Sequence, residues 1–271
     1  MKESTSSNDV KRLFFGFEVE AAWMHPLPTG RILEEQNRHI TLAFLGNTSL
    51  ARIQNDLEDF PISRSFLGLA GRCDRLLFLP EKLPHVVAGH IEWFEQTALL
   101  YVHQELISWL TKHGYNVDTR ELLSHVTIAR SPFIIKDWKE AFSPFPLIAK
   151  SLNLYESVGD LSYHSIWNIP FLSIIEEISH TADIAFRIRG KDLQQLFLNA
   201  QLALAFNFPD MLQFISDGSN IQDLDDLIIQ LNGNVSRADS VVGCPFKAIS
   251  FHGKITKDTY GFLLWEMIVD V

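Results

Sequence analysis

Polar and apolar residues alternate in two short stretches of the chain, and both stretches carry the same four-residue pattern. His39-Ile-Thr-Leu and His125-Val-Thr-Ile each run histidine, apolar residue, threonine, apolar residue. Side chains of an extended strand point alternately to its two faces, so the histidine and threonine of each stretch share one face. The residues on the other face are predicted to lie in a core, namely Ile40, Leu42, Phe44, Val126 and Ile128.

Apolar spacing predicts further elements around these two strands. They are expected at 11–20 (strand), 49–60 (helix ended by Pro61), 64–91 (strands), 97–114 (helix closed by Gly114), 137–142 (helical turn), 152–158 and 165–171 (strands). The chain up to Phe171 therefore runs twice through a strand, a helix and a motif strand. This order indicates a two-lobed α+β fold with a groove between the lobes.

The pattern changes after Phe171. A strand, an acidic turn, a second strand and a long helix are expected, and the helix starts near Lys191. Its buried face is predicted to hold Leu193, Leu196, Phe197, Ala200, Leu204 and Ala205. The polar residues 1–10 are expected to form a flexible tail. The predicted domains are therefore 11–172 and 173–271.

Composition and charge limit the classes of function. The chain is 46% hydrophobic with a mean hydropathy of +0.05, which supports a folded core, and its net charge of −10 argues against a general nucleic-acid coat. Six arginines of the first domain could still form a local basic groove: Arg31, Arg38, Arg64, Arg72, Arg75 and Arg130. Two cysteines far apart in the sequence, no long apolar run and a polar N-terminus lead us to expect buried thiols and a cytoplasmic protein.

The paired motifs indicate phosphoryl chemistry. If the two strands are neighbours, two imidazoles and two hydroxyls line one groove. Histidine has an ordinary pKa of about 6.5, so one imidazole can accept a proton from an attacking oxygen while the other donates one to a leaving oxygen. Thr41 and Thr127 can hold the phosphate oxygens. A single such motif is usually structural, but here each copy is followed by a turn signal, Gly46-Asn47 or Ser131-Pro132.

Residues 11–172 resemble the 2H phosphoesterases, and in particular the RNA 2′,3′-cyclic phosphodiesterases, also called 2′-5′ RNA ligases. The likeness is carried by HITLAFLG, SHVTIAR, the opening RLFFGFEV and the closing residues 150–171. It implies two antiparallel sheets and hydrolysis of a cyclic phosphate to a 2′-phosphate without a metal or other cofactor. His39 would be the proton donor and His125 the proton acceptor, while Thr41, Thr127 and Arg130 would bind the substrate.

Two residues of this resemblance raise questions of placement. Arg130 lies five residues after His125, so strict alternation puts it on the face opposite Thr127. Tyr163 matches an aromatic residue that could stack on a base, although a core position fits it somewhat better.

Residues 174–271 resemble archease, an accessory protein of RNA ligation. HTADIAFRIRGKDLQQLFLNAQLAL and the final FKAISFHGKITKDTYGFLLWEMIVDV carry the likeness, whereas the central helix of that family is poorly recognisable in 206–243. The resemblance implies an RNA ligase partner and a Ca²⁺ or Mg²⁺ site formed by Asp183, Asp270 and the Val271 carboxylate. Spacing alone favours a turn cap for Asp183 and a solvated Asp270.

We therefore expect an RNA-end processing enzyme that acts on 2′,3′-cyclic phosphates and is fused to an archease-like domain. A phosphodiesterase of small cyclic nucleotides is one alternative. A non-catalytic partner of an RNA ligase is the other, although both His-x-Thr motifs are intact.

Overall fold

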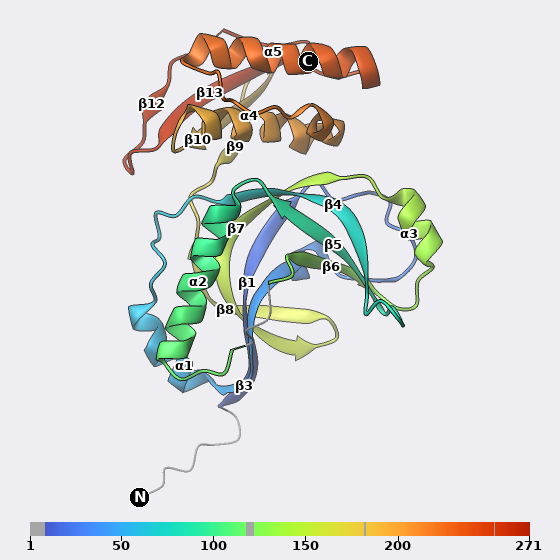
Figure 1. The fold of residues 1–271 in the computed structure, drawn as a ribbon, viewed down its shortest axis with the longest axis vertical. Coiled ribbons are helices and arrows are strands. Elements are labelled where there is room, and N and C mark those ends of the chain that lie inside the picture. Colours follow the sequence, from blue (N-terminus) through green and yellow to red (C-terminus); the bar gives the residue numbers. More distant parts are fainter. Residues whose placement is uncertain (1–8, 118–121, 182, 252) are drawn as a thin grey trace, which may run out of the picture. The chain divides into compact units, whose positions relative to one another are not determined.

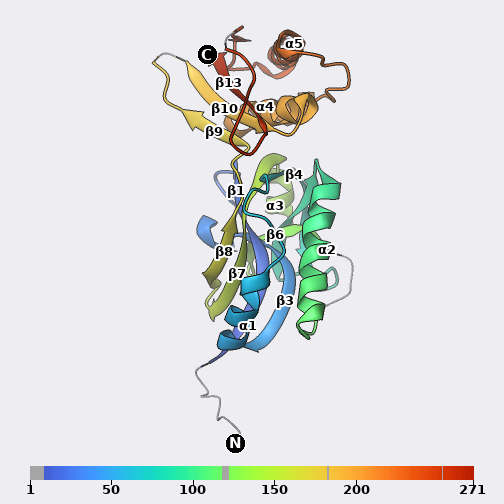
Figure 2. The ribbon, with the colours of Figure 1, turned by 90° about the vertical axis from the view of Figure 1, so that its left-hand side faces the viewer.

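The computed structural model describes residues 9–117, 122–181, 183–251 and 253–271, which form two compact units (Figures 1 and 2). The first unit holds Met1–Glu20, His25–Phe142 and Ile148–Phe171. The second holds Leu172–Val271 and two short segments from earlier in the chain, Ala21–Met24 and Ser143–Leu147. The chain therefore passes between the two units more than once, whereas the sequence predicted a single boundary between 172 and 173.

The start of the chain differs from the expected tail over 1–10. Residues 1–8 lie outside the described part, but strand β1 already begins at Val10. Asp9 accepts hydrogen bonds from Ser49 and from the backbone N–H of Ala51, which fixes it at the start of helix α1.

The first unit is built mainly from strands. Its elements are β1 (Val10–Ala21), β2 (Arg31–Ile32), η1 (Glu35–Asn37), β3 (His39–Ser49), α1 (Leu50–Asp56), η2 (Leu57–Asp59), β4 (Leu69–Leu79), β5 (Val86–Trp93), α2 (Gln96–Lys112), β6 (His125–Arg130), α3 (Ile135–Ala141), β7 (Phe145–Gly159) and β8 (Ser162–Pro170). The predicted helices and strands are thus present, with shifted ends.

The strands form one eight-stranded sheet in the order β1-β3-β6-β5-β4-β7-β8, with β2 on β6. An additional pairing of β1 with β7 links the two sides of this path. The expected antiparallel sheets are thus present, and they are continuous with each other, because β1 bonds to strands of both halves. The antiparallel pairing is confirmed for β1–β3, β3–β6, β5–β6, β4–β5 and β7–β8. The two motif strands, β3 and β6, are direct neighbours.

Helix α2 supports this sheet through one apolar face. Leu99, Val102, Leu106, Trp109 and Leu110 are buried at the helical spacing that the sequence predicted. The end of α2 is tied to η2 through Asp59, which accepts hydrogen bonds from Trp109 Nε1 at 2.8 Å and Lys112 Nζ at 2.7 Å. These donors, the Lys112 ammonium first, lower the pKa of Asp59 to about 2.

The second unit places two helices against a small sheet (Figure 1). Its sheet has the order β11-β13-β10-β9, with β12 on β13, and α4 contacts both β10 and α5. Its elements are β9 (Ile175–Ile178), β10 (Ile184–Gly190), α4 (Leu193–Asn207), η3 (Pro209–Phe214), α5 (Leu224–Val242), β11 (Ala248–Ile249), β12 (Thr256–Lys257) and β13 (Leu263–Asp270).

Residues 206–243, in which the central helix of the archease family is poorly recognisable, contain helix α5. It runs for 19 residues, is capped by the Asp223 side chain at its start, and ends at Gly243 with a left-handed φ of 74°. The predicted buried face of α4 is confirmed for Leu196, Phe197, Ala200, Leu204 and Ala205, whereas Leu193 is half-buried.

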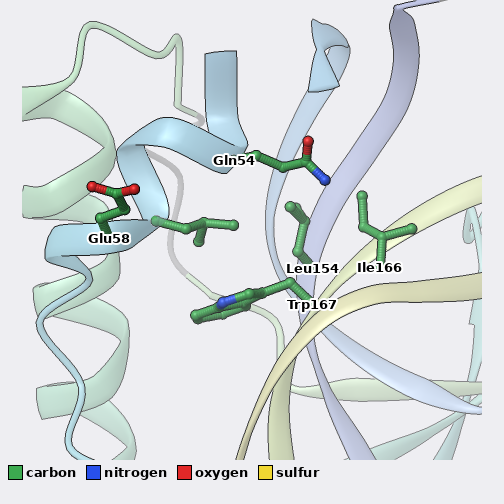
Figure 3. A pocket seen from close by; sticks show the side chains of 6 residues that line it. Gln54, Glu58, Leu154, Ile166 and Trp167 are labelled. Carbon is green, nitrogen blue, oxygen red and sulfur yellow. The ribbon is translucent and has the colours of Figure 1, made fainter. Parts of the chain in front are cut away.

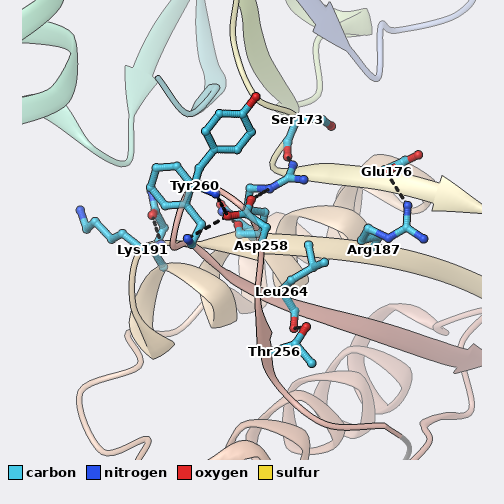
Figure 4. A network of polar contacts seen from close by, with 12 residues as sticks. Ser173, Glu176, Arg187, Lys191, Thr256, Asp258, Tyr260 and Leu264 are labelled. Atoms are coloured by element: carbon cyan, nitrogen blue, oxygen red, sulfur yellow. Dashed lines mark hydrogen bonds and ion pairs between the residues drawn. The ribbon is translucent and has the colours of Figure 1, made fainter. Parts of the chain in front are cut away.

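Charged side chains join the strands of the second unit (Figure 4). Arg187 bridges Glu176 and Glu266, both at 3.1 Å. Arg189 Nε donates to Asp258 at 2.8 Å, and Asp258 also accepts from the backbone N–H groups of Tyr260 and Phe262. These donors lower the pKa of Asp258, against the opposing effect of its burial. The acidic and basic residues here are therefore used to hold strands together.

The structure also describes the two cysteines and the character of the helices. Cys73 is buried as expected, but Cys244 is only half-buried, and both are free thiols. Within the described ranges, no helix is long and apolar enough to cross a membrane.

Candidate active site

A cavity of about 410 Å³ in the first unit brings the two motifs together. Its walls come from β1, β3, β5 and β6, from the end of β4, and from the β7–β8 hairpin. It is lined by Arg12, Phe14, His39, Thr41, Phe44, Leu79, Val86, His125, Thr127, Arg130, Ser157 and Tyr163. All five catalytic and substrate-binding residues expected from the sequence thus lie around one cavity.

The two strands align the motifs side by side. Ile40 of β3 is paired with Val126 of β6, and both side chains are fully buried. His39, Thr41, His125 and Thr127 are half-buried on the other face. Neither threonine hydroxyl has a hydrogen-bonding partner among the described residues, so both are available to a ligand.

Each histidine is held in the same way. His39 Nδ1 lies 2.9 Å from the carbonyl oxygen of Asn37, and His125 Nδ1 lies 2.7 Å from that of Leu123. A carbonyl accepts, so each Nδ1 carries the proton. This leaves Nε2 of each ring as the atom that can exchange a proton with a bound substrate. The carbonyl lies two residues before the histidine in both strands, so the two half-sites repeat each other.

The surroundings of the two histidines differ. The His39 ring lies 4.8 Å from Phe14, 5.3 Å from Tyr155 and 4.5 Å from Tyr163, measured between ring centroids. Burial in this aromatic shell lowers the pKa of His39 to about 4; the Asn37 carbonyl opposes this shift and the charge of His125 adds to it. His39 is therefore neutral at pH 7 in the free protein. Tyr163, expected in the core or on a base, is half-buried at the cavity wall against His39.

Each motif strand contains a β-bulge, and the bulge in β6 explains the placement of Arg130. Ala88 of β5 pairs with Thr127 and Val87 pairs with Ala129, so Ile128 is an extra residue in β6. The extra residue reverses the alternation beyond it. Arg130 consequently returns to the face of His125 and Thr127, which strict alternation had excluded.

A β-bulge in β3 likewise explains why Phe44, predicted to lie in the core, does not. Gly16 of β1 pairs with Thr41 and Phe15 pairs with Ala43, which leaves Leu42 as the extra residue. Phe44 is therefore turned out of the core, is 59% exposed, and lines the cavity. Burial lowers the pKa of His103 on α2 and the Leu42 backbone opposes this shift, so the expected helix-face residue lies beside this bulge.

The guanidinium of Arg130 has a donor available to an anionic ligand. Its Nε is buried and has no hydrogen-bonding partner among the described residues. An unsatisfied buried donor is costly, and a phosphate oxygen in the cavity would satisfy it.

The arginines that line the cavity differ from those predicted to form a basic groove. Of the six proposed arginines only Arg130 lines the cavity. Arg72 pairs with Glu92 and Arg75 with Asp74, while Arg38 is buried and donates to the Leu33 carbonyl. The cavity instead contains Arg12 of β1, which the sequence analysis missed. Its position two residues before Phe14, on the same face of the first strand, was the available signal.

The expected metal ligands lie at one end of the second unit's sheet. Asp183 precedes Ile184, Asp270 follows Val269, and these two residues pair across antiparallel strands. Asp183 Oδ2 is 3.6 Å from His180 Nδ1, Asp270 Oδ1 accepts from Ser250 at 3.2 Å, and Lys247 Nζ lies 2.6 Å from Val271 O. Among the described residues no three His, Cys, Asp or Glu side chains gather as a metal site.

Two other cavities of the first unit lack a comparable set of groups. One of about 250 Å³ is mostly apolar, with Leu154, Ile166 and Trp167 facing Gln54 and Glu58 (Figure 3). The other, of about 430 Å³, contains His90, but its Nδ1 is already bonded to Asp74 at 2.6 Å.

Comparison with known proteins gives similarity to solved structures alone. No protein-family model and no curated protein matches the sequence. Similar solved structures include one described as a phosphoesterase (20% identity, TM-score 0.44), E. coli LigT complexed with 3′-AMP (20%, 0.43) and a protein of Thermus thermophilus (15%, 0.45). These matches cover 60%, 60% and 59% of this chain, and 98%, 98% and 97% of the solved chains.

Proposed function

We propose that the first unit is an RNA 2′,3′-cyclic phosphodiesterase that works with two histidines and without a metal ion. The observation that carries this proposal is the repeated placement of His39 and His125. Each ring has its Nδ1 bonded to a carbonyl and its Nε2 available, and both line one cavity with two unbonded threonine hydroxyls. These groups supply an acid, a base and donors to a phosphate.

In the proposed reaction His125 Nε2 accepts a proton from water as the water oxygen attacks phosphorus. The bond between phosphorus and the 3′ oxygen breaks, and His39 Nε2–H donates its proton to that oxygen. The products are a 2′-phosphate and a 3′-hydroxyl. Thr41, Thr127 and Arg130 donate hydrogen bonds to the non-bridging oxygens, where negative charge develops.

The donor role requires His39 to be protonated in the complex. Its pKa of about 4 in the free protein opposes this. A cyclic phosphate is an anion, and an anion in the same poorly solvated site favours the imidazolium form. Binding of the substrate and protonation of His39 are therefore expected to occur together.

RNA is favoured over a small cyclic nucleotide by the groups that extend past the histidines. Arg12 and the exposed ring of Phe44 line the cavity in addition to the groups that the proposed reaction uses. Cationic and aromatic groups in one groove suit a single-stranded nucleic acid. The small-nucleotide alternative would leave them unused.

Activity in the presence of EDTA is the direct test. We expect hydrolysis of an oligonucleotide with a 2′,3′-cyclic phosphate end at an unchanged rate after chelation. Loss of activity with EDTA and its return with a divalent ion would contradict the metal-independent mechanism. A complete absence of turnover would favour the non-catalytic alternative.

For the second unit we propose an archease-like role as a cation-binding accessory to an RNA ligase. The position of Asp183 and Asp270 at the same end of the β10–β13 ladder supports this. Ca²⁺ or Mg²⁺ should raise the melting temperature of the full chain, because it binds the native state. Lys247 reaches Val271 O at 2.6 Å and has to move aside if that carboxylate is a ligand.

Single substitutions test this site in the full chain. Asp183→Asn and Asp270→Asn should each abolish the shift and the stimulation of a partner ligase, whereas the exposed Glu177→Gln is the control. No heat of binding at millimolar calcium or magnesium would refute the cation site.

A further inference from the structure

The cavity that holds the two histidines contains a cation that the proposed reaction does not use. Arg12 lines it from β1, is exposed, and has no hydrogen-bonding or ion-pair partner among the described residues. Its neighbour Lys11 is in a different situation, because it forms an ion pair with Glu156 at 2.9 Å. Arg12 is thus free to bind a ligand.

The strand geometry places Arg12 next to the reacting centre. Arg12 and Phe14 are two residues apart on β1, so they share a face and lie about 7 Å apart along the strand. The Phe14 ring is in turn 4.8 Å from that of His39. Arg12 therefore lies beside Phe14, the residue whose ring contacts the catalytic histidine, and this position suits a group that adjoins the cyclic phosphate.

Arg12 and Arg130 approach the histidines from opposite ends. Arg12 pairs with Asn47, seven residues beyond Ile40 on β3. Arg130 lies four residues beyond Val126 on β6, which is paired with Ile40 and runs in the opposite direction. A ligand that contacts both arginines must therefore extend across the catalytic pair.

The charge of the cavity selects an anion at this second position. Its described lining contains Arg12 and Arg130 but no Asp or Glu, in a chain whose net charge is −10. The nearby Glu156 is neutralised by Lys11. Ser157, on strand β7 that pairs with β1, adds a hydroxyl to the same wall. A guanidinium with a hydroxyl matches a phosphate group.

We propose that Arg12 and Ser157 bind the phosphodiester that joins the cyclic-phosphate nucleotide to the rest of an RNA chain. This assignment rests on the proposed function, since it takes the cyclic end to lie between His39 and His125. A cyclic mononucleotide has no such second phosphate. The enzyme therefore prefers RNA ends, and Arg12 supplies the preference.

Three substrates and two variants of the full chain test the assignment. The substrates are a dinucleotide with a 2′,3′-cyclic phosphate end, the same dinucleotide with a neutral methylphosphonate linkage, and a nucleoside 2′,3′-cyclic monophosphate. The variants are Arg12→Gln and, as a control, Arg64→Gln, which removes an exposed arginine outside the cavity lining.

We expect the unchanged protein to favour the phosphodiester over the methylphosphonate in kcat/KM by about fivefold to tenfold, as for one charged hydrogen bond. Arg12→Gln should remove this preference and leave the other two substrates unaffected, and Arg64→Gln should behave like the parent. With the phosphodiester substrate, Arg12→Gln should also make the slope of log kcat/KM against log salt concentration shallower by about 0.7.

Two results would overturn the assignment. An equal loss on all three substrates would mean that Arg12 acts at the reacting phosphate or supports the fold, and no loss on any would mean that it touches no ligand. If the unchanged protein cleaves none of the substrates, the proposed function fails. Calorimetric binding of the uncyclised phosphodiester and methylphosphonate dinucleotides to the parent and to Arg12→Gln then decides the subsite separately.

Discussion

At the scale of single residues, the chemistry depends on which nitrogen of each imidazole is occupied. Asn37 and Leu123 hold Nδ1 of the two rings through backbone carbonyls, which no side-chain substitution removes. The tautomer is therefore a property of the strands. This leaves the imidazoles themselves as the informative sites for substitution.

His39→Ala and His125→Ala should each lower hydrolysis of a cyclic-phosphate substrate by about 10²- to 10⁴-fold, as for loss of a general acid or base. The double variant should be little worse, because the two groups act in one step. Thr41→Ala and Thr127→Ala should cost about tenfold each. Steady-state kinetics measures these losses, and near-normal turnover by either histidine variant would refute the mechanism.

A substrate with sulfur in place of the bridging 3′ oxygen separates the two roles. A thiolate leaves without protonation, so His39→Ala should regain most of its activity on this substrate. His125→Ala should not, because the water still requires a base. Rescue of His125→Ala in place of His39→Ala would show that the assigned roles are exchanged.

The pH dependence should reflect the aromatic shell of His39. The reaction needs one neutral and one protonated imidazole, so kcat/KM falls when both are protonated. Because the pKa of His39 is about 4, this fall is expected only below about pH 5. Phe14→Ala admits water, raises the pKa towards 6.5, and should shift the acid limb upward.

A series of kcat/KM measurements from about pH 3.5 to 8 shows this shift, with circular dichroism to confirm folding. Phe44→Ala serves as the control, because it also opens the cavity wall but no contact of its ring with His39 is found among the described residues. An unchanged limb in Phe14→Ala would refute the proposed cause of the low pKa.

Alternation predicted the shared face of His39 and Thr41, and of His125 and Thr127, because period two holds over a few residues. It could not place Phe44 or Arg130, since one extra residue at Leu42 or Ile128 reverses every position that follows. A bulge depends on the partner strand, and the partners β1 and β5 are distant in sequence. Arg12 was missed for a similar reason, because its cavity forms only when β1 and β3 pair.

At the scale of elements, the join between β1 and β3 depends on Gly16. A Cβ at this position would lie 2.7 Å from the Ile40 carbonyl oxygen, beside the bulge and next to Thr41. Gly16→Ala should separate the strands, cost about 1–3 kcal/mol of unfolding free energy, and lower kcat. Chemical denaturation and kinetics measure both effects.

Gly159→Ala is the matched control for this prediction. Its φ of 94° makes alanine costly, but no described residue lies within 4 Å of the added Cβ, and Gly159 is outside the cavity lining. Stability should fall while kcat stays near the parent value. Equal losses of kcat in both variants would mean that general destabilisation is responsible.

Helix prediction was more successful where one apolar face is continuous. Helix α2 could be predicted from its apolar face, because each turn contributes a buried residue. Helix α5 was poorly recognised although Asp223 and Gly243 are strong boundary signals, since Asn232, Gly233 and Asn234 interrupt its centre. Asn234 is buried and donates to Gln201, a tertiary contact that compensates for its low helix propensity.

At the scale of the whole molecule, a fragment covering 9–171 should fold and retain the proposed phosphodiesterase activity. The strands that carry the cavity lie within this range. Trp23 and Phe145, whose rings lie 5.4 Å apart, belong to the second unit and would lose the rest of it. Phe145 is buried and Trp23 is half-buried; exposing a buried Phe side chain costs about 1.5–3 kcal/mol, so the melting temperature should fall.

Calorimetry and hydrolysis assays of the fragment, compared with the full chain, test this division. A kcat/KM close to that of the full chain would show that the first unit is catalytically complete. A soluble, folded fragment without activity would mean that the second unit contributes to the reaction.

The two β-bulges, in β3 and β6, place different residues in the two halves of the cavity. They bring the fifth residue after each histidine into the cavity, and these equivalent places hold Phe44 on one strand and Arg130 on the other. The aromatic ring at one of these places and the guanidinium at the other make the two halves of the cavity unequal, as does the aromatic shell around His39. In the proposed reaction, a cyclic phosphate would therefore meet different groups on its leaving side and on its attacking side.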